Sequence, residues 1–131
     1  MTRLKIFFLT FSIVAICIFS NSKAYAQAQK QMVRLAKLEI DSTHLQSYKI
    51  FLREEIEASI KLEKGVLTLY AVFEVNKPNH LTILEIYKDK KAYEKHIKTP
   101  HFKKYKEGTK DMVKALELVE TLPLIPNMKI K

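Results

Sequence analysis

Apolar residues alternate or run together in four short segments of the chain, and each segment predicts a β-strand. The segments cover residues 32–40, 66–75, 81–87 and 113–121. Alternation with a period of two places successive side chains on opposite faces of a sheet. In the second and third segments the apolar residues are nearly continuous, which is typical of strands covered on both faces. The sheet is therefore expected to need a cover on each side.

A helix is predicted between the first two strands, because apolar residues recur there at intervals of three and four. These residues are Leu45, Tyr48, Leu52, Ile56 and Ile60. Asp41 or Ser42 is expected to cap the first turn. Gly65 is expected to end the helix with a positive φ, a conformation that glycine adopts readily after a helix.

The segment between the last two strands predicts two short helices in place of one. Asp89 is placed to cap a helix that runs to His96. Thr99 is placed to cap the next, with Pro100 at its first position, where the missing N–H costs nothing. This second helix is expected to end near Met112.

The residues Asn76-Lys77-Pro78-Asn79 predict a tight turn, so that the second and third strands form a hairpin. The resulting order is β-α-β-β-α-β with a broken second helix. This is the order of a ferredoxin-like split βαβ unit, an α+β fold. Helices can cover only one face of such a sheet, so a second copy of the chain is expected to cover the other face in a homodimer.

The start of the chain has the features of a secretory signal peptide. A basic beginning, an apolar run over residues 6–20 and the small-x-small motif Ala24-Tyr25-Ala26 predict cleavage near Ala26. The run is shorter than the roughly 20 residues that span a membrane, so no stable membrane anchor is expected. The mature protein is therefore expected in the periplasm or outside the cell. Cys17, the only cysteine, would be lost with the signal peptide.

Residues 27–122 are expected to form one domain, followed by an irregular tail at 123–131. The net charge of +9 raises the question of a nucleic-acid partner. However, the lysines between residues 88 and 110 lie on helix faces opposite the apolar residues, as on an ordinary solvated surface. Export also separates the protein from cellular nucleic acid, so no nucleic-acid partner is expected.

Two residues of the third strand are candidates for chemistry. Glu85 and Tyr87 share one side of the strand with Leu81 and Ile83. A carboxylate in an apolar row needs a reason, because burying an unpaired charge is costly. Glu85 either bonds a neighbouring backbone group or a lysine, or serves as a base whose pKa burial has raised.

The two histidines on either side of the helix break are further candidates. His96 faces inward with Tyr93, either as a core residue or as a base. His101 lies in a first helical turn, where the macrodipole favours neutral imidazole, and it serves either as a cap or dimer contact or in binding. Because a helix break separates the two histidines and no cysteine or aspartate cluster joins them, no metal site is predicted. The chain also lacks a nucleophile elbow and a phosphate loop.

The motifs of this region resemble those of the antibiotic biosynthesis monooxygenase family. They are Glu85-Ile86-Tyr87, the helix Ala92-Tyr93-Glu94-Lys95-His96, the sequence Thr99-Pro100-His101-Phe102 and the corner from Glu63 to Tyr70. The resemblance covers about residues 32–122. It implies a dimeric α+β barrel, in which the sheets of two chains pack face to face. Tyr87 stands where the family usually has tryptophan, and the chain has no tryptophan.

The resemblance also implies an activity. Family members include monooxygenases that oxidise quinol-type or polyphenolic substrates with O₂ and without a cofactor, since a deprotonated dihydroxy-aromatic ring can itself reduce O₂. It implies Glu85, His96 and Tyr87 as catalytic residues. The substrate-binding residues that it implies are His101, Phe102, Tyr70 and Tyr93.

The sequence leaves two alternatives to this activity. The first is a non-catalytic dimeric module that binds small aromatic molecules. The second is haem degradation, which related proteins carry out with an asparagine, a tryptophan and an axial histidine. Leu38, Tyr87 and Lys106 stand at those places here, which disfavours haem degradation.

Overall fold

The structure is a computed structural model that describes residues 31–126. The predicted signal peptide and residues 127–131 of the predicted tail lie outside the described residues. Within the described residues, 31–125 form one compact unit. None of the helices within residues 31–126 is both long enough and apolar enough to cross a membrane.

Four antiparallel strands form one sheet in the order β2-β3-β1-β4. The strands are β1 (Met32–Ile40), β2 (Val66–Phe73), β3 (His80–Tyr87) and β4 (Val113–Thr121). The helices are the 3₁₀ turn η1 (Ser42–His44), α3 (Leu45–Leu62), α4 (Lys90–His96) and α5 (Pro100–Thr109). This is the predicted β-α-β-β-α-β order with a broken second helix.

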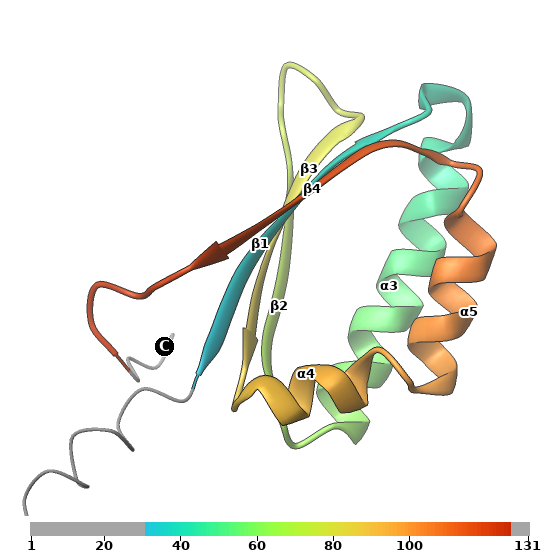
Figure 1. Cartoon of the computed structure of the whole chain (residues 1–131). Helices are drawn as coiled ribbons and strands as arrows, with labels where there is room; N and C mark the ends of the chain where they lie inside the picture. Colours follow the sequence, from blue (N-terminus) through green and yellow to red (C-terminus); the bar gives the residue numbers. More distant parts are fainter. Residues whose placement is uncertain (1–30, 127–131) are drawn as a thin grey trace, which may run out of the picture. The chain divides into compact units, whose positions relative to one another are not determined.

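The helices lie on one side of the sheet (Figure 1). The long helices α3 and α5 run side by side, and the short α4 lies beside the start of β2 and the end of β3. The core between them and the sheet is apolar. Its most buried members are Ala36, Leu38, Ile40, Tyr48, Leu52, Leu81 and Ile83. Their burial orients every other residue of β1 and β3 toward the helices.

The buried side of α3 differs from the predicted apolar stripe. Ile60 is 50% exposed, whereas Glu55 and Ser59 are 4% and 0% exposed. The two polar residues tolerate burial because the Ser59 hydroxyl donates a hydrogen bond of 2.7 Å to Glu55 Oε1. Tyr48, Leu52, Glu55 and Ser59 therefore form the inner row of the helix, and polar side chains face the core at one end.

The predicted caps of the broken helix are confirmed. Asp89 Oδ1 accepts a hydrogen bond of 2.8 Å from the Ala92 N–H, and Thr99 Oγ1 accepts one of 3.3 Å from the Phe102 N–H. Helix α5 ends at Thr109 instead of near Met112, because the Thr109 carbonyl accepts a turn bond from the Met112 N–H.

Gly65 has a different role from the expected one. Its φ does not lie in the positive range, so the predicted left-handed helix end is wrong. A Cβ atom at Gly65 would lie 2.6 Å from the Cβ of Ala92, closer than packed atoms approach. Glycine here allows α4 to pack tightly against the corner that leads into β2, where Lys88 N–H also donates to the Gly65 carbonyl at 2.8 Å.

The opposite face of the sheet is apolar but uncovered in the single chain. Tyr70 and Val72 of β2 are 65% and 46% exposed. Tyr70 pairs with Leu84, and Leu84 in turn pairs with Leu35, so these three residues lie on this face by strand alternation. The one-sided helical cover agrees with the prediction from sequence.

Candidate functional site

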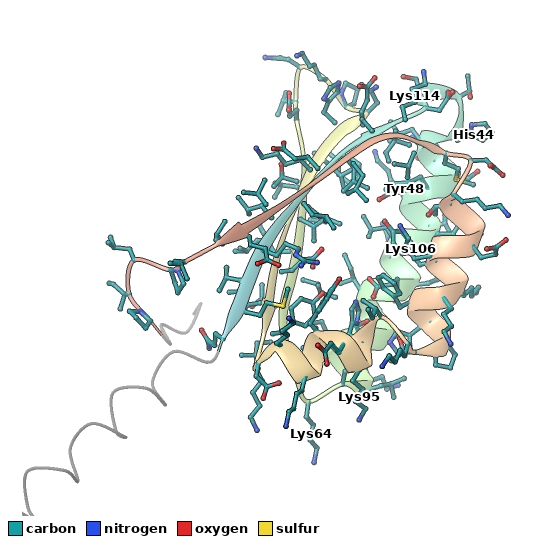
Figure 2. All side chains as sticks on the ribbon, viewed as in Figure 1. His44, Tyr48, Lys64, Lys95, Lys106 and Lys114 are labelled. Carbon is teal, nitrogen blue, oxygen red and sulfur yellow. The ribbon has the colours of Figure 1, made fainter. Side chains whose placement is uncertain are left out.

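A cavity of about 390 Å³ lies between the helices and the inner face of the sheet. Figure 2 shows the side chains on both sides of this space. The cavity brings together Glu85, Tyr87 and His96, the three residues that the sequence predicted as catalytic. Tyr93 and Phe102 supply aromatic walls. A cavity of this size, with apolar and aromatic walls and several polar groups that converge on it, is typical of a small-molecule site.

Glu85 and Tyr87 form a hydrogen-bonded pair at the wall of the cavity. The Tyr87 hydroxyl donates to Glu85 Oε2 at 2.9 Å. Burial raises the pKa of Glu85 above its usual range, and the bond from Tyr87 offsets only part of that shift. Burial and the neighbouring Glu85 also raise the pKa of Tyr87, so Tyr87 remains a protonated donor. The pair therefore presents a carboxyl group with raised proton affinity to the cavity.

His96 and His101 meet on one carboxylate that the sequence analysis did not single out. Glu63 Oε1 lies 3.0 Å from His96 Nδ1 and 2.6 Å from His101 Nε2. Burial alone would raise the pKa of Glu63, but the hydrogen bonds from His101 and His96 lower it. Glu63 is therefore an ionised acceptor, and each ring donates an N–H to it. The corner motif that begins at Glu63 was the signal available in the sequence.

A second buried carboxylate lies on the other side of the His96 ring. Glu55 Oε1 lies 3.6 Å from His96 Nε2, and the two side chains are 5% and 3% exposed. Burial raises the pKa of Glu55, although the Ser59 hydroxyl and the nearby histidines oppose the shift. Both ring nitrogens of His96 thus face carboxylates. A charged residue inside the amphipathic pattern of α3 was the overlooked signal.

Arg34 is a cation at the cavity that sequence analysis also missed. Its side chain is 9% exposed, and its Nη2 donates to Glu120 Oε1 at 3.0 Å. Its guanidinium carbon lies 4.5 Å from the centre of the Tyr93 ring. Burial by itself would lower the pKa of Arg34. The hydrogen bonds to Tyr93 and Glu120 outweigh this effect, so the net shift of the pKa is upward and the group stays charged. An arginine in the same alternating row as Ala36 and Leu38 was the signal in the sequence.

The predicted substrate-binding residues separate into two groups. Tyr93 and Phe102 line the cavity. His101 lies behind His96, on Glu63, with a side chain that is 17% exposed. Tyr70 lies on the opposite face of the sheet, because it pairs with Leu84 while its neighbour Leu69 pairs with Glu85. Tyr70 therefore takes no part in this cavity within one chain.

The structure also brings together ligand types that could hold a metal ion. Among the described residues, Glu63 Oε1, His96 Nδ1 and His101 Nε2 lie within 4.8 Å of one another. The prediction of no metal site relied on the helix break between the two histidines. The break instead turns α5 so that both histidines reach Glu63.

Comparisons with known proteins agree with the fold. Residues 32–108 match the family model for antibiotic biosynthesis monooxygenase. A crystal structure from Bacteroides thetaiotaomicron, assigned to antibiotic biosynthesis monooxygenases, is 60% identical and covers 79% of this chain and 99% of its own, with a TM-score of 0.78. No curated protein matches the chain.

Two more distant structures extend the comparison. A protein from Lactobacillus acidophilus assigned as a monooxygenase is 29% identical over 69% of this chain and 43% of its own, with a TM-score of 0.68. A protein from Nitrosomonas europaea is 20% identical over 75% of this chain and 94% of its own, with a TM-score of 0.69. At 20% identity, the similarity to the Nitrosomonas europaea protein shows only that the two share a fold.

Proposed function

Because this chain belongs to the antibiotic biosynthesis monooxygenase family, we propose that it oxidises a quinol-type or polyphenolic ring with O₂ and without a cofactor. The observation that carries the proposal is the cavity that joins Glu85, Tyr87 and His96 between aromatic walls. A flat ring fits between such walls, since aromatic side chains stack on it or meet it edge to face.

The reaction needs little from the protein beyond binding and one proton transfer. Removal of a phenolic proton makes the ring electron-rich enough to transfer an electron to O₂. Recombination at a ring carbon, followed by loss of water, gives a hydroxyquinone. One hydroquinone and one O₂ thus yield one hydroxyquinone and one water, and all atoms and electrons balance. The site must hold the ring, accept the proton and limit the access of water.

We assign the role of base to Glu85. Its Oε2 accepts the bond from Tyr87, which leaves Oε1 for the substrate hydroxyl. Its raised pKa moves its proton affinity toward neutral pH, where a general base works best. His96 is the weaker candidate, because both of its ring nitrogens already face Glu63 and Glu55.

Arg34 supports the same assignment through charge. Its cross-strand partner on β1 and β3 is Glu85, so the two side chains point to the same side of the sheet. The guanidinium group favours an anionic oxygen in the cavity, which is what a deprotonated quinol presents. Arg34 therefore stabilises the charge that forms when Glu85 takes the proton.

An oxygen electrode tests the proposal with chelator-treated protein and a panel of small hydroquinones and polyphenols. We expect O₂ consumption above the uncatalysed rate without flavin, haem or nicotinamide. Glu85→Gln should lower kcat by about 10²–10⁴-fold, the usual contribution of one general base. His96→Ala should have a smaller effect, and Glu74→Gln, at an exposed glutamate after β2, is the matched control.

The position of Tyr87 provides a further arm of this experiment. Tyr87→Trp restores the residue that the family usually has, and we expect it to keep or raise the rate. No turnover above autoxidation with the whole panel would contradict the enzyme proposal. Retained ring binding under those conditions would support the alternative, a dimeric module that binds small aromatic molecules in the same cavity.

We also propose that the protein works as a homodimer after export. The exposed Tyr70 and Val72 on the uncovered sheet face support the dimer, since obligate interfaces are apolar. Cleavage of residues 1–26 and a periplasmic or secreted location follow from the signal motif in the sequence alone.

A further inference from the structure

We propose that Glu63, His96 and His101 form a binding site for a divalent first-row transition-metal ion. Each residue offers one ligand atom, and the three atoms lie within 4.8 Å of one another. This site goes beyond the proposed reaction, which uses Glu85 and needs no metal.

The donor set fits this class of ion. Two imidazole nitrogens and one carboxylate oxygen are the ligands of many catalytic zinc sites and of non-haem iron sites. Calcium and magnesium prefer all-oxygen sites, so they fit this set poorly. The side chain of His101 is 17% exposed, so an ion can reach the cluster from solvent on this side.

The two distances from Glu63 to the histidines need only a small adjustment. Ligand atoms bonded to one metal ion at about 2.0–2.2 Å are roughly 3 Å apart. The separation of 3.0 Å between Glu63 Oε1 and His96 Nδ1 already agrees with this value. The separation of 2.6 Å between Glu63 Oε1 and His101 Nε2 must widen slightly. Rotation of the partly exposed His101 ring provides that change.

The local charges favour a cation at this point. The side chains of Glu55 and Glu63 are 5% and 8% exposed, and within the described residues their ion-pair partners are histidines alone. Buried carboxylates without a permanent positive partner are costly. Lys64 and Lys95 lie at this end of the folded unit (Figure 2), but the side-chain contacts of Glu55 and Glu63 are with the histidines and Ser59. A divalent ion supplies the missing charge.

Glu55 gives His96 the support that metal-bound histidines usually have. A histidine that binds a metal through one nitrogen commonly donates its other N–H to a carboxylate. If the ion replaces the proton on Nδ1, the proton of His96 moves to Nε2, which faces Glu55 Oε1 at 3.6 Å. Ser59 holds Glu55 in place from the other side at 2.7 Å. Neutral His96 can therefore bind the ion through Nδ1 and keep its one ring proton.

The backbone holds the three ligands at a fixed corner. Glu63 is the C-cap of α3, His96 is the last residue of α4 and His101 lies in the first turn of α5. Thr99 fixes the break between the two histidines, because its hydroxyl donates to the His96 carbonyl at 2.7 Å and accepts from the Phe102 N–H. A bound ion therefore joins three helices and should stabilise the fold.

A metal titration of tag-free, chelator-treated protein tests the site. We expect one equivalent of Co²⁺ to give visible absorption bands of a nitrogen- and oxygen-bound ion, and Zn²⁺ to displace it. His101→Ala and Glu63→Gln should weaken binding by more than about 100-fold, and Glu55→Gln by about 10–100-fold, as for other residues that support a metal ligand. His44→Ala, at an exposed histidine elsewhere, should bind as the unchanged protein does.

A second measurement needs no variant. In NMR spectra of the ring nitrogens, Zn²⁺ should shift two of the four histidines, and these should be His96 and His101. Saturable binding that is lost in His101→Ala but kept in His44→Ala would support the site. Absence of saturable binding, or shifts at the other two histidines only, would overturn it and leave the cluster as a hydrogen-bonded corner. This outcome is independent of O₂ consumption, so it is distinguishable from failure of the proposed reaction.

Discussion

The Tyr87 hydroxyl donates a hydrogen bond of 2.9 Å to Glu85, the residue two positions earlier on the same strand. Side chains two apart on a strand point to the same face, so β3 itself forms this pair. Tyr87 is 1% exposed, which fixes its ring and therefore the direction of its hydroxyl. The buried Tyr87 ring therefore holds the carboxyl group of Glu85 toward the cavity.

This pair predicts a pH-dependent effect of Glu85→Gln on stability. Burial raises the pKa of Glu85 above its ordinary value of 4.5, so ionisation costs free energy in the folded state only. The cost develops as pH rises above 4.5 and is complete above the folded pKa. Glutamine keeps the bond from Tyr87 but carries no charge. We therefore expect it to stabilise the fold at pH 7, with the gain vanishing as the pH falls below the ordinary pKa of a glutamate.

Thermal or urea unfolding at several pH values measures this effect. Glu74→Gln, at the exposed glutamate after β2, is the control, and the effect of this substitution on stability should change little with pH. A loss of stability in Glu85→Gln at pH 7 would contradict the assignment of a buried carboxyl group with a raised pKa. A gain together with lost turnover would be the usual exchange of stability for function at a catalytic residue.

A second prediction concerns the hydroxyl pair of Tyr48 and Tyr105, whose oxygens are 2.7 Å apart. Tyr48 is fully buried, whereas Tyr105 lines the cavity. Tyr105→Phe leaves the Tyr48 hydroxyl buried without a partner and should cost about 1–3 kcal/mol of unfolding free energy. Tyr48→Phe should cost less, because water in the cavity can reach Tyr105.

A double-mutant cycle measures the coupling between the two tyrosines. The double variant should cost less than the sum of the single variants, since it leaves neither hydroxyl without a partner. Additive effects would show that the bond contributes nothing. Burial raises the pKa of Tyr105 to about 12, so the cycle can be measured near neutral pH without ionisation of this group.

The uncovered sheet face predicts the assembly. Tyr70→Lys together with Val72→Lys places two charges on that face, and we expect the protein to become a monomer that keeps its fold. Both side chains are already exposed in the single chain, so their replacement leaves the core intact. The unchanged protein should be a dimer with an interface on the order of 2,000 Å².

Light scattering after size-exclusion chromatography gives the mass of each variant. Ile50→Lys on α3 is the matched control, because Ile50 is also an exposed apolar residue, at 61%, but lies on a helix. It should remain dimeric. A monomeric unchanged protein at micromolar concentration would contradict the dimer. If loss of the dimer also abolished turnover, Tyr70 would matter for function through the partner chain.

The signal motif predicts a processed N-terminus. Mass spectrometry of protein from the cell envelope and the culture medium should find a chain that begins at Gln27. Replacing the two small residues of the Ala24-Tyr25-Ala26 motif with larger ones should leave the longer precursor in the membrane fraction. An unprocessed product from the unchanged sequence would contradict export by cleavage.

Much of the fold could be predicted from the sequence because local interactions determine it. The alternation in residues 32–40 and 113–121 agrees with the bounds of β1 and β4. Asp89 and Thr99 cap their helices through bonds to groups three residues away, so neighbours in sequence were sufficient. Glu85 and Tyr87 were recognisable for the same reason, as polar residues in an apolar row of one strand.

Contacts between distant segments decided the rest. Glu63, His96 and His101 converge only because α4 packs against Gly65 and the break at Thr99 turns α5. Strand register placed Tyr70 on the outer face, a choice that its own sequence neighbours leave open. A periodic pattern reports which residues share a face, but it carries no information on which face another element will cover. That information lies in long-range packing, and packing placed the charged side chains of Glu55 and Arg34 beside the cavity.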